Sequence, residues 1–341
     1  GVITASEGNL AAYSTVWLLE AAAYCAVNCY ALISGYVGYS DRPKPLRLAR
    51  CIELWLQVVF YSVIITTVYC IAGVGSVGVS NFADAFLPVT SKQYWYFTAY
   101  IGMFFFIPLL NALVRRLNRR ALVSLCIMLI AVFSLYDTFA SFWKKDPLAL
   151  VGGHSPLWLG VLYIFGAAMK KLRVPESMSS KKALLIYASA AVFTALFKIT
   201  GDRLLRFVPG SLFVRDTSPT VLLCAAALLV AFARFKPGRK LTEFAVLFAP
   251  AAFGVYLLHV SPLVFEHVIG NRFAFIGRLP FPLIPFAVLA SAGVILVVGL
   301  AADKVRILLF KALGVPKLCR KAEKSIRRLW MHVVDAAAKG E

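Results

Sequence analysis

Long apolar stretches separated by short polar loops fill most of this sequence. Nine such stretches are found, at residues 15–39, 51–75, 95–114, 121–138, 156–170, 183–200, 219–234, 242–265 and 283–304. A helix that crosses a hydrocarbon layer of ~30 Å needs ~20 mainly apolar residues, and several of the stretches have that length. Irregular backbone and open sheet edges cannot face lipid, so helices are the default spanning element. The pattern therefore predicts an all-α, polytopic membrane bundle with about nine transmembrane helices.

The composition indicates that lipid is the solvent of this chain. Of its 341 residues, 60% are hydrophobic and 15% are charged, whereas soluble domains have ~45–50% apolar and ~25% charged residues. The net charge of +20 could indicate a nucleic-acid partner. Membrane proteins also concentrate Lys and Arg in their cytoplasmic loops, however, so we expect no nucleic-acid partner. The seven cysteines form no CxxC pair and have no histidine at zinc-ligand spacing, so we expect no metal site.

The distribution of Lys and Arg predicts the orientation in the membrane. Of the 36 Lys and Arg residues, 27 fall in alternate loops and in the C-terminal tail; these segments are 40–50, 115–120, 170–182, 234–240 and the residues from 303 onward. The positive-inside rule places this set in the cytoplasm. The C-terminus is then inside and residue 1 outside the cytoplasmic membrane. A protein with both ends inside needs one more helix before residue 1, which makes ten, and the first residue is Gly rather than Met.

The C-terminal tail is basic and amphipathic. Ile326, Leu329, Trp330 and Val333 recur at helical spacing among many Lys and Arg residues. Anionic lipid attracts each nearby Lys or Arg by ~1 kcal/mol, so this pattern favours a helix along the inner leaflet over a partner-binding arm. We therefore predict a membrane domain over residues 1–305 and a cytoplasmic tail over residues 306–341.

Ionisable residues inside membrane segments are costly and mark functional sites by default. His259 lies deep in the eighth segment, towards its predicted outer end, and a neutral imidazole can take a proton from a hydroxyl near pH 7. A histidine that only packs between helices is the alternative. Glu20 lies about one turn into the first segment and could orient a histidine or pair with a cation, or could merely end a helix at the interface. Asp137 is expected at the outer end of the fourth segment.

Two arginines mark the start of the next helix. Arg47 and Arg50 are three residues apart and share a face if a helix begins there. Two guanidinium groups on one face can bind phosphate groups, such as those of a nucleotide-carrying acyl donor. Taken alone, the two arginines are better explained as ordinary cytoplasmic loop charge, and Glu53 could pair with either of them.

Five stretches in order resemble membrane acyltransferase family 3, which includes O-acetyltransferases of bacterial surface polysaccharides. They are VNCYALISGYVGY at 27–39, RLAR at 47–50, YWYFTAYIGMFFFIPLLN at 94–111, LWLGVLYIFGAAMKK at 157–171 and FGVYLLHVSPLV at 253–264. The first two are similar to the family's second helix and following cytoplasmic loop. The resemblance extends to about residue 305.

The resemblance implies ten core helices with both ends in the cytoplasm. It implies an acyl-CoA donor, usually acetyl-CoA, as co-substrate and no bound cofactor, with a hydroxyl of an extracytoplasmic or lipid-linked glycan as acceptor. The family's RxxR arginines match Arg47 and Arg50, and its YLxH-like position matches His259, as a possible supporting base. The family's principal catalytic histidine lies in a first helix that has no counterpart here, so this stretch alone is expected to be inactive.

The sequence leaves three functions open. In the first, an acyltransferase binds acyl-CoA phosphates on Arg47 and Arg50, and Asn28, Tyr30 or Ser34 supplies donors for the oxyanion. In the second, the bundle is a transporter or flippase for a small polar solute, for which short helices are suited. In the third, the chain is a non-catalytic membrane scaffold.

Overall fold

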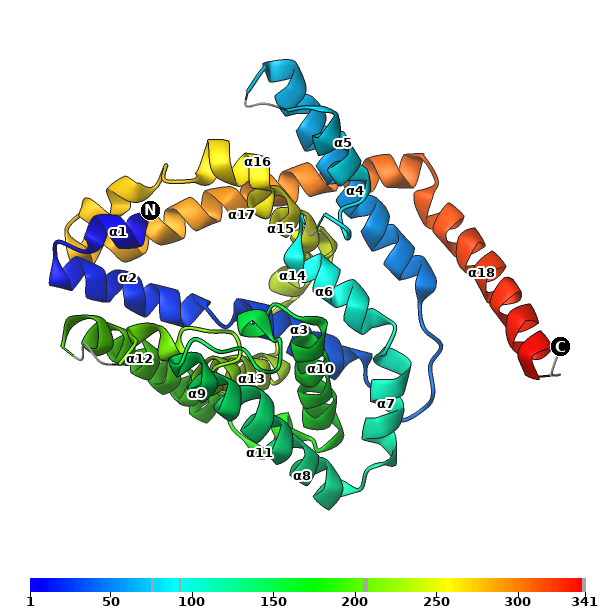
Figure 1. Cartoon of the computed structure of the whole chain (residues 1–341), viewed down its shortest axis with the longest axis horizontal. Coiled ribbons are helices and arrows are strands. Elements are labelled where there is room, and N and C mark those ends of the chain that lie inside the picture. Colours follow the sequence, from blue (N-terminus) through cyan, green and yellow to red (C-terminus); the bar gives the residue numbers. More distant parts are fainter. Residues whose placement is uncertain (75–76, 92, 205–207, 339–341) are drawn as a thin grey trace. The chain divides into compact units, whose positions relative to one another are not determined.

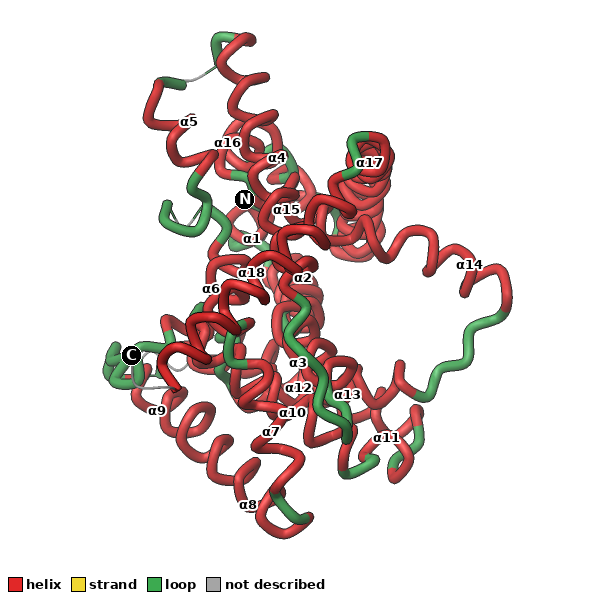
Figure 2. The backbone as a smooth tube through the Cα atoms, turned by 90° about the vertical axis from the view of Figure 1, so that its right-hand side faces the viewer, coloured by secondary structure: helices red, strands yellow, loops and turns green. Residues whose placement is uncertain are grey.

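A computed structural model describes residues 1–74, 77–91, 93–204 and 208–338. The chain is all-α and 80% helical. Figure 2 shows only helices and loops in the described part of the chain. The predicted fold class is therefore confirmed. Residue 75 of the predicted segment 51–75, the side chain of Val333 and the last three residues of the tail lie outside what is described.

Each of the nine apolar stretches forms helix (Figure 1). The longer helices are α2 (Leu10–Ala23), α3 (Ala26–Gly38), α4 (Leu48–Ala72), α6 (Trp95–Phe104), α7 (Ile107–Arg116), α8 (Arg119–Ile130), α10 (Pro156–Lys171), α12 (Ser180–Arg203), α13 (Pro219–Ala233), α14 (Arg239–Phe248), α15 (Ala252–Val260), α17 (Ile284–Ala312) and α18 (Val315–Ala338). Shorter helices are α1 (Val2–Ser6), α5 (Val79–Phe86), α9 (Asp137–Phe142), α11 (Val174–Ser177) and α16 (Pro262–Val264). Single turns of 3₁₀ or π geometry are η1 (Ala131–Tyr136), η2 (Val151–Gly153), η3 (Gly210–Phe213), η4 (Ala249–Ala251), η5 (Phe265–Ile269), η6 (Ala274–Arg278) and η7 (Phe281–Leu283).

Within the described part of the chain, fewer than nine helical spans have the length and composition of a membrane-crossing helix. Among the described residues, six helical spans are long and apolar enough to cross a membrane, or seven if α6 and α7, bent by 57°, form one span. The other two segments, α10 and α13, have 16 and 15 residues. At 1.5 Å of rise per residue, such helices reach only about 24 Å. Because most of the α10 side chains are buried in protein, this helix needs little contact with lipid.

The chain divides into two compact units. Unit 1 comprises Gly1–Lys44, Trp95–Gly238 and Asn271–Leu289, and unit 2 comprises Pro45–Tyr94, Arg239–Gly270 and Ala290–Glu341. The predicted division into residues 1–305 and 306–341 is a different one and stays a prediction. The structure of each unit is described by itself.

Unit 1 is built around the close crossing of α3 and α10. A Cβ atom on Gly166 would lie 2.0 Å from the backbone oxygen of Leu32, and one on Gly35 would lie 2.0 Å from that of Tyr163. Only glycine permits this backbone contact, which is how small residues join helices in a membrane. Trp158, Leu159 and Leu162 on α10 are completely buried next to the crossing.

A π-helical turn interrupts the fourth segment. The helix runs as α8, η1 and α9 from Arg119 to Phe142, and η1 has π geometry over Ala131–Tyr136. Asp137 follows the π turn directly and is completely buried, although the helix continues for another turn. The expectation that Asp137 ends this helix is therefore wrong.

In unit 2, α4 packs against α15, α16 and α18. Gln57 and Tyr61 of α4 both donate hydrogen bonds to Asp303 Oδ1, at 3.0 and 2.8 Å. Arg306 pairs with the same carboxylate at 2.7 Å, so this buried charge is fully compensated. Gly254 of α15 packs directly on Asp303, because a Cβ atom there would lie 2.2 Å from Oδ1.

Substitution of Gly166 by Ala tests the crossing of α3 and α10. The added methyl group must push the two backbones apart, so we expect a loss of about 1–3 kcal/mol of stability and a lower Tm. Gly160→Ala on the same helix is the matched control, because a Cβ atom there has no neighbour within 4 Å and Ala favours a helix over Gly. Thermal unfolding in detergent measures both variants, and equal Tm values would contradict the close crossing.

Candidate functional site

The two predicted phosphate-binding arginines lie at the start of α4. Arg47 is the N-cap residue of the helix, but its side chain makes no capping hydrogen bond. The residue is exposed to solvent. Arg50 is also exposed and pairs with Glu53 at 3.7 Å, which identifies the arginine that Glu53 contacts. No described carboxylate lies within ion-pair distance of Arg47. Both guanidinium groups can therefore reach a ligand in solvent, and Arg50 must exchange its carboxylate partner to do so.

The tail helix α18 caps this same helix start. The Leu48 backbone N–H donates to Glu323 Oε1 at 3.2 Å, and Arg327 donates to the same oxygen at 2.7 Å. Arg327 also donates to the backbone oxygen of Leu46. The Arg327 hydrogen bond is the main cause that lowers the pKa of Glu323. The first turn of α4, which carries Arg47 and Arg50, is thus held by two residues far away in the sequence.

The histidine of α15 has a defined tautomer. Nδ1 of His259 lies 2.7 Å from the backbone oxygen of Val255. A carbonyl oxygen can only accept a hydrogen bond, so Nδ1 carries the proton and Nε2 of the neutral ring keeps its lone pair. The imidazole is half-buried, and the Tyr256 ring contacts it edge-on at 6.3 Å between centroids. His259 can therefore accept a proton through Nε2.

Three buried hydroxyl groups adjoin this helix. Ser62, Tyr94 and Ser261 are completely buried, and none makes a hydrogen bond of good geometry with a described residue. Burial raises the pKa of Tyr94, and its neighbours Ser261 and Ser62 oppose that increase. The Tyr94 ring lies 6.1 Å from that of Tyr256, which in turn contacts His259. These hydroxyls are donors that the sequence did not indicate, because they come from three separate segments.

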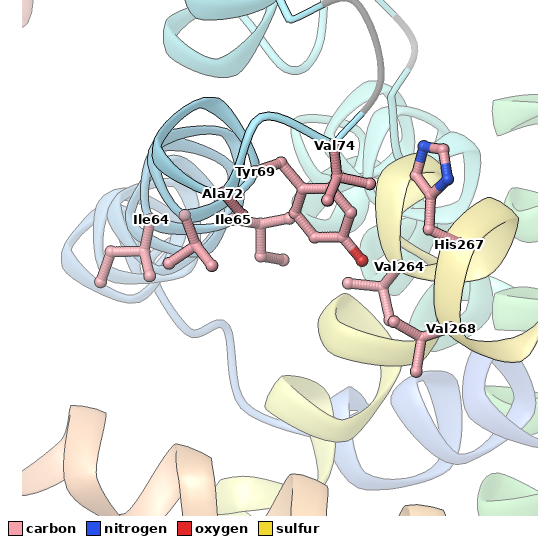
Figure 3. Close-up of a pocket in the computed structure, with 9 residues that line it drawn as sticks. Ile64, Ile65, Tyr69, Ala72, Val74, Val264, His267 and Val268 are labelled. Atoms are coloured by element: carbon pink, nitrogen blue, oxygen red, sulfur yellow. The ribbon is translucent and has the colours of Figure 1, made fainter.

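A pocket of about 500 Å³ lies between α4 and the segment after α16 (Figure 3). Its lining is almost entirely aliphatic, with Ile65, Val264 and Val268 among the residues. Figure 3 shows the Tyr69 ring with His267 next to it, and the centroids of the two rings are 5.5 Å apart. Such a lining suits a hydrocarbon chain better than a charged ligand.

Unit 1 contains the other predicted residues, with different surroundings for each. Asn28 is completely buried, donates to the backbone oxygen of Asp216 at 2.7 Å and accepts from Trp158 Nε1 at 3.1 Å. Ser34 donates to the backbone oxygen of Tyr30 within its own helix, at 2.9 Å. Tyr30 is exposed and lines an apolar groove between α3 and α13. Half-buried Glu20 has no ion-pair partner within the described residues.

The hydrogen bonds of Asn28 lead to a polar cluster of which sequence reasoning had singled out only Asp137. His154 Nε2 lies 3.3 Å from Asp216 Oδ2, and its ring stacks on Trp95 at 3.9 Å with 18° between the planes. Arg215 Nη2 lies 3.7 Å from Asp137 Oδ2. The one available signal is their place on the predicted outer side: His154 and Asp216 lie two and three residues before α10 and α13, and Trp95 begins α6.

The predicted site residues thus fall into two sets. Arg47, Arg50 and His259 belong to unit 2, whereas Glu20, Asn28, Tyr30 and Ser34 belong to unit 1. Among the described residues, no group of three or more potential metal ligands is found.

A family model described as an acyltransferase domain matches residues 3–302. The chain belongs to acyltransferase family 3. It is therefore a multi-pass membrane acyltransferase, with a transferase activity that uses an acyl donor and an acceptor. No curated protein and no solved structure matches the chain.

The contact between α18 and α4 of this acyltransferase is open to a direct test. Glu323→Ala removes the cap of α4, and loss of a cap costs about 1 kcal/mol. Trypsin should therefore cut the Lys- and Arg-rich α18 about fivefold faster at pH 7. Glu243→Ala is the matched control, since that carboxylate pairs only with exposed Arg239.

The pH dependence of the same contact follows from the lowered pKa of Glu323. A carboxylate whose folded pKa is lowered stabilises the fold above its unfolded pKa of about 4.3, and this contribution is lost as the pH falls through the folded pKa. The contact should therefore persist from pH 7 to 5. Loosening of wild-type α18 within that range would contradict the role of the carboxylate.

Proposed function

We propose that this protein is a membrane-embedded O-acyltransferase that moves an acyl group, in particular acetyl, from cytosolic acyl-CoA to a hydroxyl of a cell-surface or lipid-linked glycan. The observation that carries the proposal is the exposed arginine pair at the start of α4 in a chain of this family. Its charge, spacing and accessibility match the phosphate groups of the donor.

The donor binds on the cytoplasmic side, at the first turn of α4. Arg47 and Arg50 are three residues apart at the N-terminus of α4 and both are exposed, so a ligand with several phosphate groups can contact both. Guanidinium groups form paired, charge-assisted hydrogen bonds with phosphate oxygens. The cap from Glu323 keeps the helix start ordered, which reduces the conformational entropy lost when the donor binds.

The chemistry requires a base and a group that stabilises the oxyanion. His259 has its Nε2 lone pair available and serves as a supporting base, with Glu20 as a weaker candidate. Candidate donors for the oxyanion are Asn28, Tyr30 and Ser34, of which the Ser34 hydroxyl must first leave the backbone oxygen of Tyr30; the others are the buried hydroxyls of Ser62, Tyr94 and Ser261 beside α15. Correct orientation of two substrates can supply ~7–11 kcal/mol of the barrier reduction.

The membrane placement follows the charge pattern. The basic loops and the C-terminus face the cytoplasm, and α18 lies along the inner leaflet. Supporting this, Ile326, Leu329 and Trp330 of α18 remain exposed although the helix packs on α4. Residues 306–341 are then a cytoplasmic tail attached to a membrane domain over residues 1–305.

Substitution of Arg47 tests donor binding in the full-length protein. Arg47→Ala should raise the Kd for CoA about tenfold, as expected for one charge-assisted hydrogen bond. The Kd for pantetheine, which lacks the phosphates, should not change. Arg42→Ala removes the same charge from the same loop and is the control. Equal Kd values for Arg47→Ala and wild type would refute the assignment, and transport of a solute without acceptor-dependent release of CoA would favour a transporter.

Substitution of Glu53 gives the opposite effect. Glu53→Gln frees Arg50 from its carboxylate partner, so CoA binding should tighten by about two- to fivefold, the strength of an exposed ion pair. Titration calorimetry with CoA measures the change. Weaker binding by this variant would mean that Arg50 does not contact the phosphates.

A further inference from the structure

The tail helix α18 holds the residues on both sides of Arg47. Glu323 accepts a hydrogen bond from the backbone N–H of Leu48 at 3.2 Å. Arg327 donates to the backbone oxygen of Leu46 and pairs with Glu323 at 2.7 Å. Arg47 lies between these two backbone contacts, and its own side chain makes no capping hydrogen bond. The backbone conformation of this phosphate-binding candidate therefore depends on α18.

One side of α18 makes the contact with α4. Cys319, Glu323 and Arg327 are spaced four residues apart, so they lie along one side of the helix. Cys319 is only 2% exposed. Burial raises the pKa of its thiol, and the nearby Glu53 carboxylate of α4 adds to the increase. Because Glu323 and Arg327 share a side only while this segment is helical, the contact with α4 requires a folded α18.

The rest of the α18 surface is exposed and has two different characters. An apolar stripe lies on one flank of the α4 contact and consists of Leu318, Ile326 and Leu329, with exposed fractions of 61%, 45% and 67%. A basic stripe lies on the other flank and consists of the exposed residues Lys317, Arg320, Lys321, Lys324 and Arg328. A helix that combines an apolar stripe with Lys and Arg on its polar face is the type that lies on an anionic lipid surface. Both the shape and the charge of α18 therefore fit a membrane leaflet.

The chain enters α18 directly from a candidate membrane span. The helical segment Phe281–Ala312 has the length and composition of a spanning helix. Gly314 follows its end with φ of 69°, which glycine adopts without strain, and α18 begins at the next residue (Figure 1). A helix that begins directly after a span begins at the level of the lipid headgroups. The family match ends at residue 302, so α18 lies outside the matched domain.

The cations of α18 oppose its helical state when no lipid is present. Three pairs of like charge stand four residues apart, a spacing that destabilises a helix. They are Lys317 with Lys321, Arg320 with Lys324, and Lys324 with Arg328. Anionic headgroups neutralise this repulsion and acyl chains cover the apolar stripe, so lipid binding stabilises the helical state. A ligand that favours the helical state also favours the contact with α4 that only this state makes.

We propose that anionic phospholipid of the leaflet binds α18 and thereby raises the affinity of the donor site; this rests on the phosphate-binding role proposed above for Arg47 and Arg50. Lipid contact folds α18, and the folded helix holds Leu46 and Leu48. Arg47 is then ordered before the donor arrives. Less conformational entropy is lost on binding, so the donor binds more tightly.

The test measures the Kd for CoA of the full-length protein in two kinds of nanodisc. One contains phosphatidylcholine alone, and the other contains equal amounts of phosphatidylcholine and phosphatidylglycerol. The quantity compared is the ratio of the Kd in neutral discs to the Kd in anionic discs. An anionic surface repels CoA whatever the protein, and this repulsion cancels when the ratios of two variants are compared.

The triple variant Lys321→Gln, Lys324→Gln, Arg328→Gln removes three cations from the basic stripe. It weakens lipid binding and also relieves the repulsion within α18, so both effects reduce the dependence on anionic lipid. The Kd ratio of wild type should exceed that of this variant about fivefold, which is the strength of one helix cap. Equal ratios would overturn the inference.

A second triple variant, Arg116→Gln, Arg119→Gln, Arg120→Gln, is the matched control. It removes the same charge from exposed residues of another basic loop, in unit 1. Its Kd ratio should equal that of wild type. A ratio as low as that of the α18 variant would mean that total charge, rather than α18, sets the response to lipid.

The double variant Leu318→Gln, Leu329→Gln distinguishes a leaflet from a soluble polyanion. It keeps every charge but removes the two most exposed members of the apolar stripe, so its Kd ratio should fall below that of wild type. An unchanged ratio would mean that α18 responds to charge alone and that a leaflet is not its partner.

The two proposals fail in different ways. If wild type binds CoA and its Kd ratio equals that of the α18 triple variant, α18 does not control the donor site, and the proposed function stands. If wild type binds CoA in neither kind of disc, the arginine pair is not a donor site and the proposed function itself is wrong.

Discussion

Lipid supplies no hydrogen-bond partners, and this constraint organises the polar groups of the chain. A buried polar group in a membrane helix must find its partner within the protein or cost free energy. Asp303 follows this rule completely, with Gln57, Tyr61 and Arg306 around a single carboxylate. Lys171, the last residue of α10, also follows it: its ammonium donates to three backbone oxygens at the end of α7, at 2.7 to 2.9 Å.

The places where this rule is not satisfied are the informative ones. Among them are, in unit 2, the three hydroxyls beside the helix of His259 and, in unit 1, atoms of Asp137 and Arg215. The first group adjoins His259, and the second lies beside the loop of His154. Buried donors and acceptors without partners, next to a base, are what a site for a polar substrate requires before the substrate binds.

The fold was predictable because apolar length is a local property. All nine stretches are helical, and the family could be identified from five short segments in order. The helix breaks were harder to predict: the first stretch divides into α2 and α3, and the third bends by 57° between α6 and α7. Only six or seven of the nine stretches meet the length and composition of a spanning helix among the described residues, because α10 and α13 have 16 and 15 residues.

The site was predictable only where it is local. The pairing of Arg50 with Glu53 follows from their spacing of three residues on one helix. His154 and Asp216 are 62 positions apart, and Glu323 caps a helix that begins 275 residues earlier. No periodicity in the sequence reports such contacts, because they depend on how the helices pack.

The π turn between α8 and α9 sets which way a buried charge points. A π turn accommodates one more residue than an α turn, and one residue corresponds to about 100° of rotation around the helix axis. In an uninterrupted α-helix, Asp137 would be rotated by that angle, away from the Thr217 hydroxyl that now donates to it at 2.6 Å. A deletion of a single residue between 131 and 136 would therefore redirect the carboxylate while leaving every side chain of the cluster in the sequence. The direction of this carboxylate therefore depends on the number of residues in the π turn as well as on the residue types.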